Sequence, residues 1–160
     1  MRKYYKETKL SDLSVDILEY SRIIGKTKLS GFLYRNSQIE LGSNIIYFEQ
    51  NVLKSSKVKV YSKSNSLMIC SMKIKFWNST AKIEYHGKTY NYNSSFFGTG
   101  AISWKSENLE ILKINQSGEI EDNTSNEELA AILIGAGIQL SALYLFFFIL
   151  LACFVVIYII

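Results

Sequence analysis

Residues 129–160 of the chain read LAAILIGAGIQLSALYLFFFILLACFVVIYII. None of these residues carries a charge, whereas all 32 charged residues of the 160-residue chain lie in residues 1–128. An uncharged apolar run longer than about 18 residues is typical of a helix that crosses a membrane. We therefore divide the chain into a polar domain, residues 1–128, and a C-terminal apolar helix, residues 129–160.

The first part of this helix, residues 129–141, is rich in small side chains. Ala131 and Gly135 form one small-xxx-small pair, and Gly137 and Ser141 form another. Such spacing lets a second helix, or the backbone of strands, approach closely. The pattern predicts a packing face, either inside the N-terminal domain or against another helix.

The second part, residues 142–160, is bulkier and has the length of a membrane span. Its 19 residues rise by about 28 Å as a helix, close to the roughly 30 Å of bilayer hydrocarbon. Tyr144 and Tyr158 lie near its two ends, where tyrosines are expected at the membrane interface. We predict that residues 142–160 span a membrane once, and the alternative is a buried core helix of a soluble domain.

The distribution of positive charge predicts the orientation. No Lys or Arg follows the apolar run, and the N-terminal MRKYYKETK lacks the apolar core of a signal peptide. Because cytoplasmic flanks carry the excess of Lys and Arg, the N-terminal domain is expected in the cytoplasm, tail-anchored to the membrane.

Upstream of the apolar run, polar and apolar residues alternate in short segments separated by turn residues. This pattern predicts a mainly β fold, an antiparallel sheet or barrel, followed by one long C-terminal apolar helix. The segment 10–24 is ambiguous between a helix and a pair of strands. The expected strands are residues 29–34, 38–41, 45–50, 57–61, 67–77, 81–85, 88–92, 101–104, 109–114 and 119–121.

The alternation also predicts a basic face. If Val58, Ile74 and Ile83 point into the core, the lysines beside them point outward on neighbouring strands. Such a face is suited to an anionic lipid surface or nucleic acid, or is simply solvated; the adjacent membrane segment favours lipid and argues against nucleic acid. The candidate headgroup residues are Lys57, Lys59, Lys73, Lys75 and Lys82.

No catalytic constellation is visible in the sequence. His86 is the only histidine and falls in an expected hairpin turn with Gly87, whereas Cys70 shares a face with Met68 and Met72. These contexts predict a turn residue and a buried apolar residue, so we expect no enzyme activity, no metal site and no cofactor.

The order of features resembles that of the tubby C-terminal-like domains, which include phospholipid scramblases and LURP-one-related proteins. The resemblance lies in the repeated unit of residues 57–77, with its Lys-Ile-Lys-Phe-Trp ending, and in the Asn126–Gly135 start of the terminal helix. It covers about residues 20–145. It implies a closed barrel wrapped around the helix, and the 128 residues before the helix suggest a reduced form of the family's twelve-stranded barrel.

The resemblance also implies contact with lipids. Tubby-like members bind phosphoinositides through basic residues, a role that the five lysines match here; scramblases act on lipids and use calcium. The short acidic segment 119–122 does not match a scramblase calcium segment. We therefore expect a non-enzymatic, membrane-anchored module at the cytoplasmic lipid surface. The alternatives are a scramblase-like lipid-handling protein and a soluble tubby-like domain.

Overall fold

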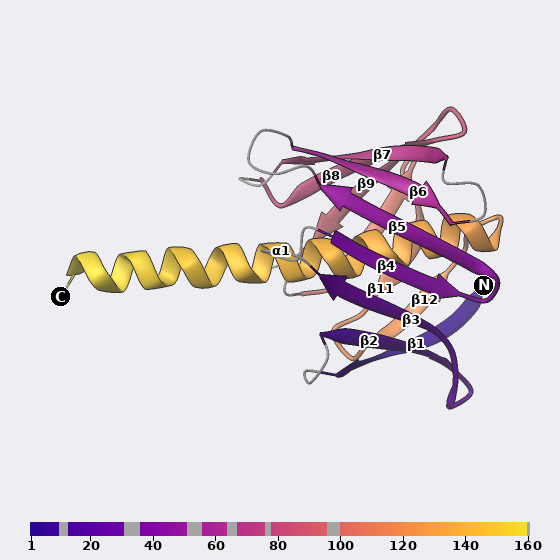
Figure 1. The fold of residues 1–160 in the computed structure, drawn as a ribbon, viewed down its shortest axis with the longest axis horizontal. Helices are drawn as coiled ribbons and strands as arrows, with labels where there is room; N and C mark the ends of the chain where they lie inside the picture. Colours follow the sequence, from indigo (N-terminus) through magenta and orange to yellow (C-terminus); the bar gives the residue numbers. More distant parts are fainter. Residues whose placement is uncertain are drawn as a thin grey trace.

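A computed structural model describes residues 1–9, 13–30, 36–50, 56–63, 67–75, 78–95 and 100–159, with side chains as far as Cys153. It contains twelve strands followed by one helix, α1 (Glu127–Ile159). Figure 1 shows the strands around the first half of α1, whereas the second half projects from the body. The strands are β1 (Arg2–Lys9), β2 (Ser14–Glu19), β3 (Arg22–Ser30), β4 (Asn36–Leu41), β5 (Asn44–Gln50), β6 (Lys57–Ser62), β7 (Met68–Lys75), β8 (Thr80–Tyr85), β9 (Lys88–Ser94), β10 (Ile102–Ser106), β11 (Leu109–Ile114) and β12 (Glu119–Asp122).

The twelve strands form one closed antiparallel barrel. Each strand pairs with its neighbours in the sequence, and β1 pairs with β12 to close the ring. Two ion pairs stabilise this closure: Arg2 contacts Asp122 at 2.8 Å, and Lys3 contacts Glu119 at 2.9 Å. Closure removes the unpaired strand edges that an open sheet would expose.

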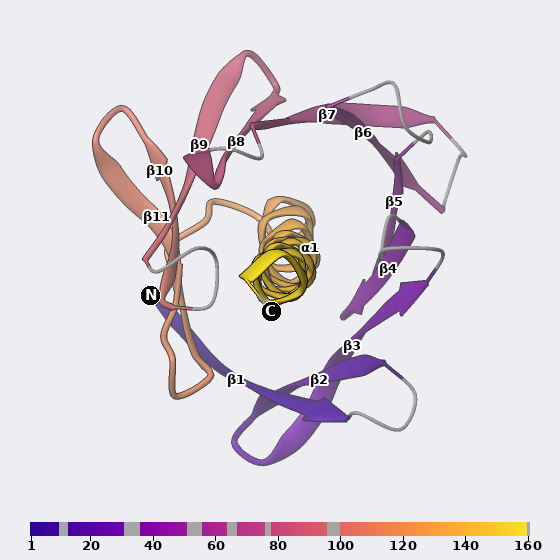
Figure 2. The same ribbon diagram turned by 90° about the vertical axis from the view of Figure 1, so that its left-hand side faces the viewer.

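The first half of α1 fills the barrel. About eight strands make a barrel that side chains alone can fill, so twelve strands leave a space along the axis. Figure 2 shows α1 in this space, surrounded by the strands. Every residue from Leu129 to Leu140 is buried, on all sides of the helix. A helix enclosed by a ring of strands buries every face, which explains why the sequence is apolar all round.

Glycine at position 135 allows α1 to approach the strands. A Cβ atom added there would lie 2.7 Å from Cε2 of Phe48 and 2.8 Å from Cγ2 of Ile39. At Gly137, the nearest atoms to such a Cβ, in Ile114 and Trp104, lie at 3.4 Å, an ordinary contact distance. The small residues therefore serve strand packing, and Gly135 is the tighter of the two positions.

Polar contacts fix the start of α1 at one end of the barrel. Oδ1 of Asn126 accepts a hydrogen bond of 2.7 Å from the backbone N–H of Leu129, which caps the helix. The Tyr85 hydroxyl donates a hydrogen bond of 2.7 Å to Glu128. We call this end of the barrel the far end, and the end from which α1 emerges the exit end.

The predicted fold class is confirmed: the chain is a mainly β antiparallel barrel with one long apolar C-terminal helix. This architecture fits a tubby-like barrel. The expectation of a reduced barrel is wrong, because strands of 4–9 residues give all twelve within the first 122 residues.

The structure departs from the predicted strands in two details and decides one alternative that the sequence left open. Residues 2–9, for which the sequence predicted no strand, form β1. The ambiguous segment 10–24 takes the strand-pair alternative: it contributes β2 and the start of β3, with a turn at Tyr20 and Ser21. Met68 is exposed because the register of β6 and β7 shifts between Val60 and Tyr61. The predicted strand residues 31–34, 76 and 77 lie outside the described residues.

We predict that Gly135→Ala destabilises the barrel relative to Gly137→Ala. Both substitutions gain about 1 kcal/mol of helix propensity, so the difference between them reports packing. Overpacking against Phe48 and Ile39 is expected to lower the free energy of unfolding of the first variant by about 1–3 kcal/mol relative to the second. Denaturant unfolding in mild detergent measures this difference, and equal stabilities would contradict the close contact.

Candidate functional site

The exposed apolar part of α1 begins directly at the barrel rim. Leu143 and Tyr144 are buried, whereas the next residue, Leu145, is 45% exposed. Phe148 and residues 149–153 are also exposed. No polar linker separates the barrel from this segment, so whatever covers the apolar surface must also contact the exit end.

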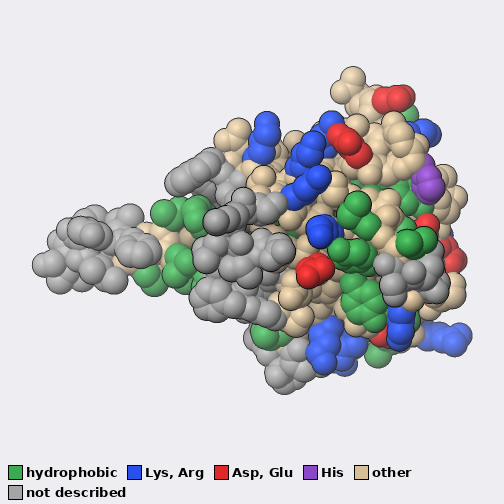
Figure 3. Space-filling view, turned by 45° about the horizontal axis from the view of Figure 1, so that its top comes forward, with side chains coloured by type: hydrophobic (Ala, Val, Ile, Leu, Met, Phe, Trp, Pro, Cys, Tyr) green, Lys and Arg blue, Asp and Glu red, His purple; other side chains and the backbone are tan. Residues whose placement is uncertain are grey.

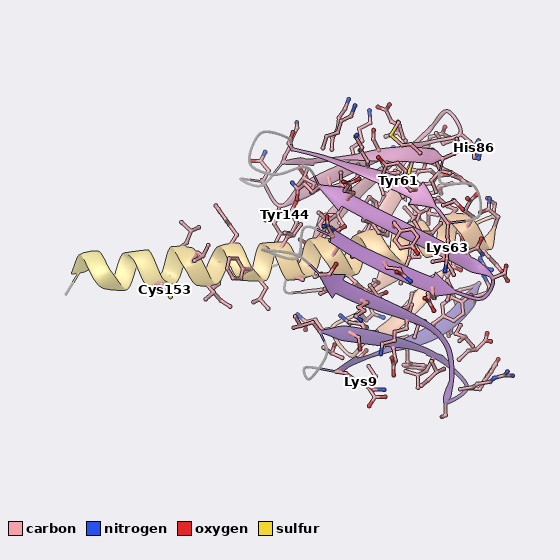
Figure 4. All side chains as sticks on the ribbon, viewed as in Figure 1. Lys9, Tyr61, Lys63, His86, Tyr144 and Cys153 are labelled. Atoms are coloured by element: carbon pink, nitrogen blue, oxygen red, sulfur yellow. The ribbon has the colours of Figure 1, made fainter. Side chains whose placement is uncertain are left out.

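Tyr144 lies inside the rim of the barrel and not on its outer surface. Its side chain is 3% exposed, its hydroxyl donates a hydrogen bond of 3.1 Å to the Thr80 carbonyl, and its ring packs near Tyr92. Figure 4 shows it where α1 leaves the strands. The predicted interfacial residue is thus a core residue, and the helix emerges three residues after the expected boundary at Ala142. The second predicted interfacial residue, Tyr158, belongs to α1, but its side chain lies outside the described residues.

The helix passes the length and composition test for a membrane span over Glu127–Cys153. Of its most apolar stretch, 61% is buried inside the protein. The buried core helix of a soluble protein and a membrane-spanning helix share this apolar composition. What bears on the choice between them is the exposed apolar segment beyond Tyr144, because a core helix would be buried along its length.

The five predicted lysines lie together on the outside of β6, β7 and β8. Val58, Val60, Ile74 and Ile83 on the same strands are buried, so the alternation places the lysines outward as predicted. Lys57, Lys59, Lys73 and Lys75 are exposed, and Lys82 is partly exposed.

The strand register brings three of these lysines into a row. Lys73 lies opposite Lys57 on one side and opposite Lys82 on the other. Asn91 of β9 continues the row beside Lys82. Like charges directly opposite one another destabilise a sheet. The row therefore holds positive charge at a density that a nearby anion would relieve.

A groove of about 350 Å³ opens beside this row. The lining includes the polar side chains of Lys73, Lys75, Thr80, Lys82, Asn91 and Asn93, from three adjacent strands. Ammonium and amide N–H groups are hydrogen-bond donors, so the groove presents donors suited to a phosphate or carboxylate. The two asparagines were absent from the sequence-based prediction because only the pairing of β8 with β9 places them beside the lysines.

Glu84 is the carboxylate nearest to the row. It forms an ion pair of 2.9 Å with Lys82 and is itself largely exposed. The hydrogen bond from Lys82, followed by the charges of Lys82, Lys73 and Lys57, lowers the pKa of Glu84. The three lysines thus act on the same carboxylate.

Charge is divided between the two ends of the barrel. Among the described residues, lysines outnumber acids in the strand halves toward the exit end: Lys6, Lys9, Lys28, Lys57, Lys59, Lys73, Lys75, Lys82 and Lys113 against Glu7, Asp16, Glu49 and Glu119. Lys26 lies at the middle of β3 and belongs to neither half. Acids outnumber cations toward the far end: Glu19, Glu40, Glu84, Glu107, Glu110, Glu121, Asp122, Glu127 and Glu128 against Arg2, Lys3, Arg22, Lys63, Lys88 and Lys105. Figure 3 shows a group of Lys and Arg side chains over the upper part of the barrel, and others at the end away from the protruding helix.

His86 and Cys70 occupy structural positions. His86 and Gly87 form the β8–β9 turn with positive φ angles of 46° and 74°. Cys70 is buried, and burial raises the pKa of its thiol to about 12, which removes the thiolate near neutral pH. Within the described part of the chain, no group of three His, Cys, Asp or Glu side chains could hold a metal ion.

No protein-family model matches the chain, and comparisons with curated proteins and with solved structures give no significant match.

We predict that Lys73→Gln stabilises the barrel. The substitution removes the repulsion of Lys73 with both Lys57 and Lys82 and should raise the free energy of unfolding by about 0.2–1 kcal/mol at low salt. At about 1 M salt, where the Debye length is about 3 Å, the gain should largely disappear. The control Lys63→Gln removes a lysine at the far end. If both variants respond alike in thermal unfolding across this salt range, the row carries no repulsion.

Proposed function

We propose that this protein is a membrane-anchored, non-enzymatic binding module, whose barrel sits on the cytoplasmic lipid surface and contacts anionic headgroups. Residues of α1 beyond Tyr144 enter the bilayer, and the basic groove of β7–β9 receives a headgroup phosphate. The observation that carries the proposal is the coincidence of two features at one end of the barrel. The apolar helix emerges where the lysines gather.

The absence of a polar linker strengthens this argument. If the segment from Leu145 onward lies in hydrocarbon, the exit end is held at the level of the headgroups. A Lys or Arg near an anionic membrane surface contributes about 1 kcal/mol of attraction. The five lysines then add to an anchor that already holds them at high effective concentration. The tubby-like architecture supports the same function, because members of that family bind phosphoinositides through basic residues.

The two alternatives have less support. For a scramblase-like activity, the short acidic segment contributes Glu119 and Asp122 to ion pairs that close the barrel, which leaves them committed to structure. For a soluble domain, α1 would expose Leu145 and residues 148–151 to water. Exposed apolar surface of this kind is typical of a segment that another apolar phase covers.

We predict that the full chain stays in the membrane pellet after alkaline carbonate extraction. A chain that ends after Leu145 keeps the buried residues of α1 and should move to the supernatant as a folded barrel. Circular dichroism of the shortened chain checks that the barrel remains. Full-length protein in the supernatant would refute membrane anchoring.

We further predict that the lysines around the groove bind anionic vesicles. In the chain that ends after Leu145, replacing Lys73, Lys75 and Lys82 by Gln should weaken binding to phosphatidylglycerol vesicles by roughly 100-fold, from about 1 kcal/mol for each lysine. Vesicle sedimentation at low salt measures this change.

The matched control replaces Arg22, Lys63 and Lys88 by Gln. This variant loses the same net charge, but at the turns of the far end. Equal weakening in both variants would show that net charge alone, rather than the groove, determines binding.

A further inference from the structure

A second hollow lies at the exit end, on the side of α1 that faces β1, β2 and β3. It is a cleft of about 290 Å³. This is near the lower end of the roughly 300–1,000 Å³ typical of small-molecule pockets. Its apolar walls are Val15, Leu29, Ile138, Ala142 and Leu145, and Lys6, Thr8, Gly100 and Ser141 complete the lining.

Lys6 is the charged group of this cleft, and it points inward. On β1 it shares the face of the buried Tyr4, and its register partner on β2 is the fully buried Ile17. Burial lowers the pKa of the Lys6 ammonium. Within the described part of the chain, no carboxylate forms an ion pair with it. An ammonium partly withdrawn from water without a counter-ion is unfavourable, so an anion beside Lys6 would stabilise this end of the barrel.

The position of Leu145 connects the cleft with the exposed segment of α1. Leu145 lines the cleft and is also the first exposed residue of the protruding helix. A long apolar chain could therefore enter the cleft from the surface that, in the proposed function, is covered by lipid. The cleft is too small for a whole phospholipid, and it suits one phosphate and part of one acyl chain.

We infer that this cleft holds one anionic phospholipid of the surrounding bilayer, with its phosphate at Lys6 and part of one acyl chain against the apolar wall. The inference rests on the proposed membrane location, but the site is distinct from the lysine groove on β7–β9. The lysine groove contacts headgroups from outside the barrel, whereas this cleft retains a single lipid between α1 and the strands.

Native mass spectrometry of the full chain in a neutral detergent tests the inference with three added probes: phosphatidylglycerol, phosphatidylcholine and oleate. One phosphatidylglycerol per chain should remain bound, in preference to phosphatidylcholine. Lys6→Gln should weaken its retention about tenfold, because it removes a charge-assisted hydrogen bond. Ala142→Phe, which fills the cleft without changing charge, should weaken it similarly.

Two controls are matched to these variants. Lys113→Gln removes an exit-end lysine on another strand, and Ala152→Phe enlarges a residue of the protruding helix; both should retain phosphatidylglycerol. Thermal unfolding of each variant checks that the barrel is intact. Unchanged retention in Lys6→Gln and Ala142→Phe, preferential retention of oleate, or no bound phosphatidylglycerol in the unaltered chain would each overturn the inference.

Carbonate extraction separates this inference from the proposed function. Lys6→Gln and Ala142→Phe should both stay in the membrane pellet, because the anchor beyond Leu145 is unchanged. If the unaltered chain left the membrane in carbonate but still retained phosphatidylglycerol in detergent, the membrane anchor would fail while the lipid cleft would stand.

Discussion

The width of the barrel is the constraint on which the rest of the structure depends. Twelve strands enclose more space than their own side chains can fill, and an empty axis would forfeit much of the apolar contact that stabilises a folded chain. Helix α1 occupies that axis, with every residue from Leu129 to Leu140 buried. The need to fill this axis explains why α1 has no polar face. It also explains why a glycine, Gly135, stands where α1 meets Phe48.

The same helix continues without a break into the exposed segment, which links the fold to the proposed location. Residues as far as Tyr144 are needed to fill the barrel, and the exposed residues begin at Leu145. Core and proposed anchor are therefore consecutive parts of one rigid element. If the exposed segment is anchored as proposed, the barrel has little freedom to tilt or to move away from the membrane surface.

Much of the fold could be predicted because the decisive signals are local. The alternation in residues 57–61 and 81–85 reports burial on one face of a strand, and the uncharged run reports a helix with no solvated side. Strand β1 gave no such signal, because Tyr4 is its only fully buried side chain and both faces carry polar residues. It is a strand because β12 and β2 pair with it, and the Arg2–Asp122 contact joins residues 120 positions apart.

Likewise, a tyrosine at a membrane interface and one buried in a barrel rim look alike in sequence, so Tyr144 could not be assigned without the barrel around it.

The candidate site likewise has a part that the sequence predicted and a part that depends on how the strands pair. Alternation alone placed the five lysines outward, but the groove depends on which strands lie side by side. Asn91 and Asn93 join the lysines only through the register of β8 with β9, and Lys6 enters its cleft only because β1 closes the ring. These elements of the site are products of tertiary structure and had no signal in the sequence.

The placement of charge is consistent with the proposed contact between the exit end and anions. Interleaving the acids of the far end among the exit-end lysines would relieve repulsion in the row of Lys57, Lys73 and Lys82. The fold instead places Lys73 directly between Lys57 and Lys82, and it leaves Lys6 partly buried without a carboxylate partner among the described residues. Both features reduce the stability of the isolated barrel. An anionic surface at the exit end would reverse both effects at once, since it would supply negative charge to the row and to Lys6 from the side on which the apolar helix emerges.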